Sequence, residues 1–448
     1  MDKIFADRTR LLAACFLGLT LLLMACSAEV TPTPATNSGN FPVPLNSTVA
    51  AEAPFTLKVW FAEDYYNQAP ITGLITEFQQ AYPKIKVEVD HAQWEKMPAK
   101  LKAAVDFGQP PDVVHQHAFA LGAQGYAEPL TELWQQWGLQ SKFLASALQD
   151  TTWNGISYGV PLDTNCTFLI YNKAFFQEAG LPSPTDHYTY TQLLADAKKL
   201  TKPEISRYGV AFNNGVWNMF GHLRSNGGNL LDETSGPLKA RLDDPANLEM
   251  LQYIGEAINQ SKVAPKLPIT RDGFNPVNSF AQGKVAMFFT GPWDLKTIQQ
   301  NATPEFYAQV GTAMMPAGMN GGTTGSVQGG GSLFVPKGSK HRAAAFEFMK
   351  WAASDKYQLR LAKEMARFPV ISSLYNDPYF TNQSLLQPFF KQLATSRPYK
   401  LEAYPEAELS WAGAIYSILS GTGGDAATIL KQANQEAQKA INLATKKV

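Results

Sequence analysis

Residues 55–89, FTLKVWFAEDYYNQAPITGLITEFQQAYPKIKVEV, contain the pattern that decides the fold. Apolar and polar residues alternate over 55–61 and again over 85–89, as they do in half-buried strands. The apolar residues between these runs recur at helical spacing: Ile71, Leu74, Ile75, Phe78 and Tyr82. Pro83 ends the helix. Strand, helix and strand in this order predict a βαβ unit and a parallel sheet.

The pattern continues with a helix around 96–105, a short strand at 112–114 and a further helix. In open parallel sheets, ligands bind at the carboxyl ends of the strands, where the loops begin. Glu63-Asp64 follows the first strand, and His115-Gln116-His117 follows the strand at 112–114. We therefore expect these two groups of polar residues on one rim.

The middle of the chain gives further expectations. Residues 159–172 predict a polar, hinge-like stretch that leads into a buried strand, and Thr189 and Gln192 have the spacing of a capping box. Residues 279–293 predict a helix end, a strand and a loop that exposes Trp293. Trp217 lies in a second turn-rich, aromatic segment.

Residues 323–332, TTGSVQGGGS, are too rich in glycine for a core strand, so we expect a flexible crossing between two lobes. Ser339 is a candidate cap for the helix that carries Ala345 and Phe348. From Asp425 onward, apolar residues recur on one face and predict a closing amphipathic helix.

The start of the chain predicts export. Three basic residues precede an apolar stretch, residues 11–25, that is shorter than the roughly 20 residues needed to span a bilayer. Leu23-Met24-Ala25-Cys26 resembles the bacterial lipobox, which implies a signal peptide over 1–25 and an acyl (palmitate) anchor on Cys26 at the outer face of the membrane. The alternative is an ordinary leader that ends in a cysteine by coincidence.

The next residues, 26–53, are rich in Pro, Thr, Ser and Ala and predict a flexible, lipid-anchored linker. About 400 residues remain after it, which is more than one hydrophobic core usually organises, so two lobes are expected. The net charge is zero, which does not suit nucleic-acid binding. Cys166 is the single cysteine of the folded part, and we interpret it as a buried apolar residue.

Seven segments occur in an order that resembles one known family: LKVWFAEDYY, ITEFQQAYPKIKVEV, PPDVV, GVPLDTNCTFLIYNKAFFQEAGL, FAQGKVAMFFTGPW, GGGSLFVPKGSKHRAAAFEFMKWAAS and ARFPVIS. The chain resembles the bacterial extracellular solute-binding proteins of ABC importers, in their sugar-type, maltodextrin-binding-protein-like branch. The resemblance implies an α/β fold of the two-lobed, type II periplasmic-binding-protein class, with parallel-sheet lobes, a hinge, a ligand cleft and a helical C-terminus.

Lobe I is expected over 54–163 with 332–353, and lobe II over 164–331 with 354–448. The resemblance also implies a function: a monomeric receptor without catalytic residues, cofactor or metal that captures a mono- or oligosaccharide and delivers it to the permease of an ABC importer.

Position by position, the resemblance implies nine ligand-binding residues: Asp64, His115, Gln116, Asn165, Trp217, Trp293, Gly330, Arg367 and Trp411. Tryptophan rings suit the C–H face of a sugar, and amides and carboxylates suit its hydroxyls. Each residue also has a purely structural interpretation. Trp217 and Trp411 are as well suited to core packing, Asp64 and Asn165 to capping, and Arg367 to a surface ion pair.

Other functions remain as alternatives. His115 and His117 suggest a metal site, although no further ligands are near them in the sequence. Tyr65-Tyr66 is similar to the tyrosine pair of ferric-ion-binding relatives, but it occurs early in this chain. An exported enzyme that acts on a glycan, a receptor for a non-sugar solute and a structural surface protein are the competing classes.

Overall fold

The computed structural model describes residues 43–52, 54–213, 215–232, 237–266, 274–319 and 324–446. All of them belong to one compact unit, Asn40–Val448. The predicted signal peptide, residues 1–25, and Cys26 lie outside the described residues. Within the described ranges, no helix is both long and apolar enough to cross a membrane.

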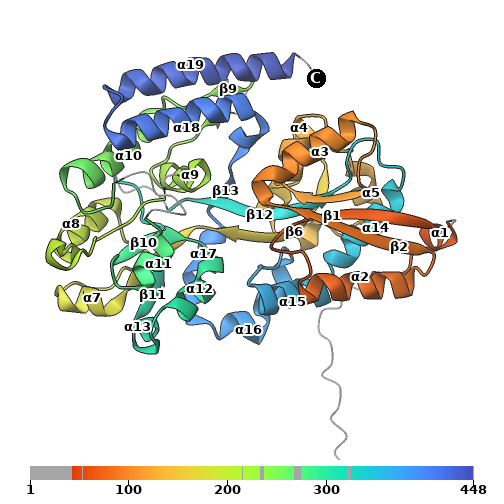
Figure 1. Ribbon diagram of the computed structural model, residues 1–448, viewed down its shortest axis with the longest axis horizontal. Helices are drawn as coiled ribbons and strands as arrows, with labels where there is room; N and C mark the ends of the chain where they lie inside the picture. Colours follow the sequence, from red (N-terminus) through yellow and green to blue (C-terminus); the bar gives the residue numbers. More distant parts are fainter. Residues whose placement is uncertain are drawn as a thin grey trace, which may run out of the picture. The chain divides into compact units, whose positions relative to one another are not determined.

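The predicted βαβ unit is confirmed (Figure 1). Strand β1 (Phe55–Ala62) leads through α2 (Ala69–Ala81) into β2 (Ile85–Ala92), and the two strands are parallel, with Phe55 opposite Ile85. Strand β3 (Val113–Gln116) is parallel to the other edge of β1. Leu57, Val59 and Phe61 are fully buried, so burial of one face holds the register of β1.

Two sheets organise the rest of the molecule. The larger has the order β13-β12-β3-β1-β2, with β6 (Gly159–Cys166) also paired to β12 (Ser326–Phe334). Strand β12 is antiparallel to β3 and β6 but parallel to β13 (Ser396–Pro398). The smaller sheet has the order β10 (Met287–Thr290), β7 (Phe168–Asn172) and β11 (Val310–Ala313), and it is antiparallel. The larger sheet is therefore mixed and the smaller one antiparallel, whereas the sequence predicted parallel sheets in both lobes.

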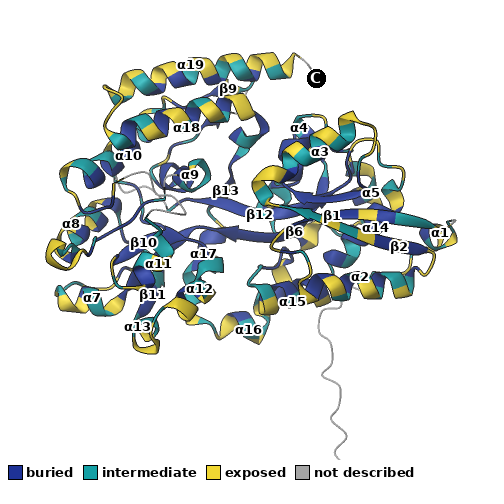
Figure 2. Ribbon diagram, viewed as in Figure 1, coloured by how far each residue is buried: buried dark blue, intermediate teal, exposed yellow. Residues whose placement is uncertain are grey.

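The expectation of a flexible crossing over 323–332 was wrong, because β12 is a buried central strand (Figure 2). Its glycines leave space that neighbouring side chains occupy. A Cβ on Gly329 would lie 2.4 Å from Oδ1 of Asn165, and one on Gly331 would lie 2.2 Å from Nε2 of His115. Gly330 has a φ of +114°, which disfavours any other residue. The hinge-like stretch predicted from residue 159 is likewise a strand, β6.

The predicted linker over 26–53 contains structure near its end. Helix α1 (Ser47–Ala51) is capped by Asn46, whose Oδ1 accepts from the backbone N–H groups of Thr48 and Val49. The backbone N–H of Asn46 donates to the hydroxyl of Tyr82 at 3.0 Å, and Val49 is fully buried in the core. These contacts attach residues 46–51 to the folded body, so the prediction of a flexible linker was wrong for them. Residues 26–42 and 53 of that prediction lie outside the described residues.

Helix ends follow local chemistry. Thr189 and Gln192 form the predicted capping box at the start of α8 (Tyr190–Leu200). Helix α14 (Arg342–Ala352) has His341 as its N-cap, so the assignment of Ser339 was wrong. The Ser339 hydroxyl instead donates to Oδ1 of Asp112 and binds the loop before β3.

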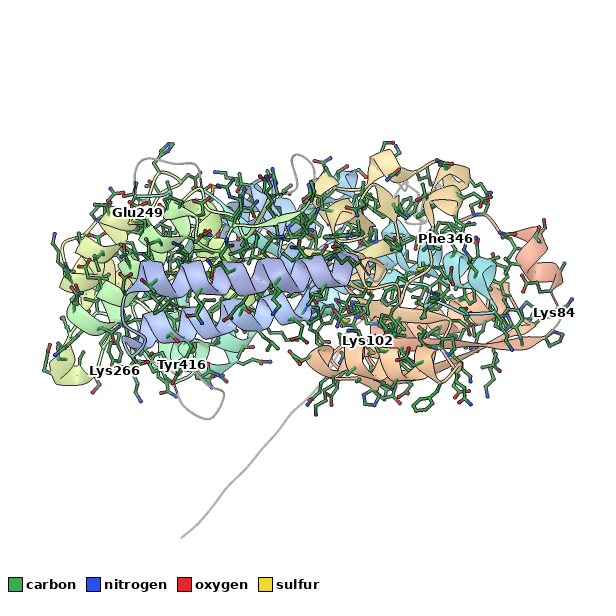
Figure 3. All side chains as sticks on the ribbon, turned by 90° about the horizontal axis from the view of Figure 1, so that it is seen from above. Lys84, Lys102, Glu249, Lys266, Phe346 and Tyr416 are labelled. Carbon is green, nitrogen blue, oxygen red and sulfur yellow. The ribbon has the colours of Figure 1, made fainter. Side chains whose placement is uncertain are left out.

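The C-terminal part is helical, as predicted. Helices α18 (Pro405–Ser420) and α19 (Ala426–Thr445) pack side by side, as Figures 1 and 3 show. Asp425 caps α19 by accepting from the backbone N–H of Thr428. Cys166, at the end of β6, is free and fully buried, in agreement with its interpretation as an apolar residue.

The remaining elements are α3 (Met97–Asp106), α4 (Ala118–Ala123), α5 (Thr131–Trp137), α6 (Ala145–Gln149), β4 (Thr152–Trp153), β5 (Ile156–Ser157), β7 (Phe168–Asn172), α7 (Lys173–Glu178), α9 (Val216–Ser225), β8 (Leu231–Asp232), β9 (Lys239–Ala240), α10 (Pro245–Gly255), α11 (Pro276–Ala281), β10 (Met287–Thr290), α12 (Trp293–Asn301), α13 (Pro304–Ala308), β11 (Val310–Ala313), α15 (Asp355–Met365), α16 (Pro378–Thr381) and α17 (Gln387–Leu393), with short 3₁₀ turns that include η1 (Trp94–Lys96) and η7 (Lys400–Ala403).

Candidate ligand-binding site

A cavity of about 1260 Å³ lies where the ends of β1, β3, β6 and β12 meet α9, α12, η7 and α18. Eight of the nine predicted ligand-binding residues line it: Asp64, His115, Gln116, Asn165, Trp217, Trp293, Gly330 and Arg367. The prediction that Glu63, Asp64 and residues 115–117 lie on one rim is confirmed, because all of them border this cavity.

Trp411 is the predicted site residue that the structure places elsewhere. It lies on α18 with its side chain fully buried in the hydrophobic core, and it does not line the cavity. Ala407 and Ile415 lie four residues before and after Trp411 on α18, and both are also buried. Trp411 therefore lies on the core face of α18, and we leave it out of the site.

Trp217 and Trp293 form an aromatic wall of the cavity. Their ring centroids are 6.1 Å apart with an interplanar angle of 52°. The indole N–H of Trp217 donates to the carbonyl oxygen of Gln328 at 3.2 Å, which holds that ring in place. Trp293 begins α12 instead of lying in an exposed loop, and its ring folds back over Gly291, where a Cβ would be 1.9 Å away.

Arg367 crosses from the end of α15 to the loop that follows β1. Its guanidinium forms an ion pair with Asp64 and lies 5.2 Å from the ring centroid of Tyr65. The Nε atom of Arg367 is buried and has no hydrogen-bond partner in the described part of the chain. Arg367 thus keeps one unpaired donor although its guanidinium is ion-paired.

His115 and Asp163 present unpartnered polar atoms. His115 is 1% exposed, neither of its ring nitrogens has a partner among the described residues, and burial lowers its pKa to about 3. Asp163 is 4% exposed; its Oδ1 accepts from the N–H of Gly331, and its Oδ2 has no close hydrogen-bond partner within the same residues, although the carboxylate interacts with the Tyr65 hydroxyl. Burial raises the pKa of Asp163 to about 6. Such atoms each cost about 1–3 kcal/mol when they stay unpaired, so they favour a bound polar ligand.

Gln116 has a positioning role. Its amide nitrogen donates to the carbonyl oxygen of Trp94 at 2.9 Å, and its amide oxygen accepts from the backbone N–H of His117. Both ends of the amide are therefore engaged within the protein. This arrangement fixes η1 against the end of β3 and places the Trp94 ring against His115 and His117.

His117 lies between two carboxylates. Its Nδ1 is 2.5 Å from Oδ1 of Asp150, and its Nε2 is 3.7 Å from Oε2 of Glu402. Burial opposes the charged imidazole, but the charges of Glu402 and Asp150 outweigh burial and raise the pKa of His117 to about 9. A protonated imidazole does not ligate a metal ion.

The metal alternatives receive no support from this geometry. In the described ranges, no three His, Cys, Asp or Glu side chains are grouped so as to hold a metal ion. Tyr65 is buried beneath Arg367, and Tyr66 stacks on His91 with ring centroids 4.0 Å apart.

Sequence reasoning missed several residues that line the cavity: Trp94, Asp163, Tyr399, Glu402 and Glu408. One of them had a usable signal. Asp163 precedes Asn165 by two residues in β6, and alternate residues of a strand share a face. The three C-terminal residues have no local motif, because only the tertiary fold brings η7 and α18 to the cavity.

The fold and this cavity define a ligand-binding protein of the type II periplasmic-binding class. Among solved structures, the chain is similar to the GacH receptor of Streptomyces glaucescens GLA.O, crystallised unliganded and with acarbose. The two share 25% identity with a TM-score of 0.73, over 87% of this chain and 99% of that chain. The predicted fold class is confirmed.

This chain belongs to the family described as bacterial extracellular solute-binding protein, whose model matches residues 63–359. It is 25% identical over 367 residues to the maltotriose-binding protein of Pyrococcus abyssi (strain GE5 / Orsay), covering 79% of this chain and 76% of that protein. It is 24% identical over 394 residues to the galactooligosaccharide-binding protein of Bacillus subtilis (strain 168), covering 86% and 89%. The chain is a binding protein and not an enzyme, and its family implies export.

Proposed function

We propose that this protein is a lipid-anchored receptor that captures a mono- or oligosaccharide in the cavity and delivers it to the permease of an ABC importer. The observation that carries the proposal is the pair Trp217 and Trp293 in the same cavity as unpartnered polar atoms of His115 and Asp163. The relatives named above bind maltotriose and galactooligosaccharides, which supports a carbohydrate ligand.

The chemistry of the lining suits a sugar ring. A pyranose has an apolar C–H face, which packs on an indole ring, and a rim of hydroxyl groups. The neutral imidazole of His115 offers one donor and one acceptor, and Asp163 offers a carboxylate oxygen. A hydroxyl both donates and accepts, so it satisfies such groups together.

The proposal includes closure of two lobes around the ligand, at the boundaries expected from the sequence. Strands β6 and β12 run between the expected lobes, and their pairing provides a hinge region. Arg367 and Asp64 come from different expected lobes, as do Glu402 and His117. A ligand that contacts both sides would stabilise the closed arrangement.

The anchor on Cys26 is part of the same proposal. A signal peptide over 1–25 would be removed, and the acylated Cys26 would hold the receptor at the outer face of the membrane. The linker would then keep a monomeric receptor close to its permease. Mass spectrometry of residue 26 in the membrane fraction tests this part: an unmodified cysteine, or a Cys26→Ala variant that stays membrane-bound, contradicts it.

Thermal-shift screening with mono- and oligosaccharides tests the carbohydrate assignment. At least one sugar should raise the melting temperature, and Trp293→Ala should weaken its binding about tenfold, because a stacking surface is lost. Trp137→Phe is the matched control, since Trp137 packs in the core of the N-terminal sheet and should leave binding unchanged. Stabilisation by a peptide, a polyamine or a metal but by no sugar would contradict the assignment, and turnover of a glycan would favour an enzyme.

A further inference from the structure

One end of the cavity is unusually acidic. Tyr399 precedes η7, Glu402 lies within η7, and Glu408 lies in the first turn of α18. All three side chains line the cavity. The hydroxyl of Tyr399 is buried, with the residue 3% exposed. It has no close hydrogen-bond partner among the described residues, and its interaction with Glu408 favours the charged form of that carboxylate. We call this group the 399–408 cluster.

Carboxylates outnumber cations among the described residues of the lining. The carboxylates are Glu63, Asp64, Glu95, Asp163, Glu402 and Glu408; the cations are Lys102, Arg367 and protonated His117. Arg367 is paired with Asp64 away from the 399–408 cluster. The ammonium of Lys102, labelled in Figure 3, lies 5.5 Å from the ring centroid of Tyr126.

Within the 399–408 cluster, the available positive charge is shared. His117 faces Glu402 at 3.7 Å, but it is closer to Asp150, at 2.5 Å. Glu408 has no ion pair with any described residue within 4.0 Å. Burial, together with the charge of Glu402, raises the pKa of Glu408 to about 7, and burial raises the pKa of Glu402. Burial thus makes the two carboxylates of this cluster costly to keep charged.

A bound cation lowers this electrostatic cost. The residues of the cluster indicate which kind of cation fits. Grouped metal ligands are absent from the described residues, which disfavours a metal ion. An ammonium group has three N–H donors, which match two carboxylates and the oxygen of a phenol. A neutral hydroxyl, by contrast, brings no charge to offset the carboxylates when the cavity loses water.

We propose that the 399–408 cluster binds the protonated amino group of an amino sugar, so that the ligand of this receptor carries a free amine. This inference rests on the proposed function as a carbohydrate receptor. It adds a charge requirement to that proposed function. Trp217 and Trp293 would stack on the sugar rings while Glu402 and Glu408 select the amine.

Calorimetric titration with matched sugars tests the inference. The panel contains neutral, amino and N-acetylated members of the gluco and galacto series, as monosaccharides and as β-1,4-linked disaccharides. At neutral pH, an amino sugar should bind at least about tenfold more tightly than its neutral and N-acetylated counterparts, since hydrogen bonds to charged groups are the stronger ones. Glu408→Gln should reduce that ratio to about threefold or less.

Glu406→Gln is the matched control, because Glu406 lies in the same turn of α18 but is exposed and outside the cavity lining. It should keep the preference for the amine. Equal or tighter binding of the neutral sugars by the wild type would overturn the inference and leave the carbohydrate function intact. Binding of no sugar at all would remove both. Stabilisation by Ca²⁺ or Mg²⁺ that Glu408→Gln abolishes would assign the cluster to a metal instead.

Discussion

Nδ1 of His117 lies 2.5 Å from Oδ1 of Asp150, and both side chains are only 8% exposed. The other carboxylate oxygen of Asp150 is 2.8 Å from the hydroxyl of Ser332 in β12. The same hydroxyl oxygen accepts from the backbone N–H of Ala118 at the start of α4. One buried ion pair thus connects the end of β3, the end of α6 and the central strand.

Replacement of His117 by Gln should lower the free energy of unfolding by about 3–5 kcal/mol, because Asp150 would remain buried without its cationic partner. Urea unfolding followed by circular dichroism measures this change. His187→Gln is the control: His187 is exposed, so its replacement should change stability by less than about 0.5 kcal/mol. A loss below about 1 kcal/mol in His117→Gln would show that the pair is not a main support of the fold.

The contribution of His117 to stability should depend on pH. Its pKa in the folded protein is about 9, above the ordinary value of 6.5. The folded state therefore keeps a proton that the unfolded chain releases, so this stabilisation is complete below about pH 6.5 and is lost as pH rises through about 9. Asp150, Glu402 and Asp163 are the charges that hold this proton.

Urea unfolding of the wild type and His117→Gln at several pH values tests this expectation. The difference in the free energy of unfolding between the two proteins should decrease from about pH 6.5 to about pH 9. The comparison with the variant removes contributions from titratable groups that do not interact with His117. A difference that stays constant over this range would mean that His117 is neutral in the folded state.

Gly330→Ala should destabilise the protein by at least about 1–3 kcal/mol, because the residue has a φ of +114° and a Cβ would lie 2.3 Å from the carbonyl oxygen of Asp163. Gly413→Ala is the opposite case. Gly413 lies exposed within α18 with open space around it, so alanine should stabilise the helix by about 0.5–1 kcal/mol. Thermal unfolding of both variants measures the expected loss of stability in Gly330→Ala and the expected gain in Gly413→Ala. Similar effects of the two substitutions would contradict the assigned backbone conformation.

Val49→Asp should detach α1 from the folded body, because a carboxylate replaces a buried apolar side chain. We expect a loss of about 1.5–3 kcal/mol and faster proteolysis before residue 54. Thr48→Asp serves as the control, because Thr48 is exposed at the start of the same helix. Equal protease resistance of wild type and Val49→Asp would show that α1 does not stabilise this segment.

The sequence by itself determined the local architecture. Alternation over 55–61 and helical spacing over 71–82 were sufficient for the βαβ unit, because a repeat of two or of 3.6 residues has one compatible backbone. The capping box at Thr189 depends on neighbours within three residues and was predicted correctly. The helix expected from Asp425 onward was also confirmed. The cap at Ser339 was wrong because the helix begins two residues later, after His341, and the Ser339 hydroxyl donates to the distant Asp112.

Only the tertiary structure decided which residues meet at the cavity. Glycine by itself disfavours a strand. Gly329 and Gly331 are nevertheless needed in β12, because Asn165 and His115 occupy the space beside them, from strands that are far away in the sequence. Trp293 and Trp411 were both predicted to bind the ligand. Trp293 lines the cavity, whereas Trp411 is buried in the core, because the two residues lie on helix faces that pack differently. Glu402 lies 285 positions after His117, so no local pattern could pair them. Their charges interact because the fold buries His117 and brings the partly buried Glu402 beside it.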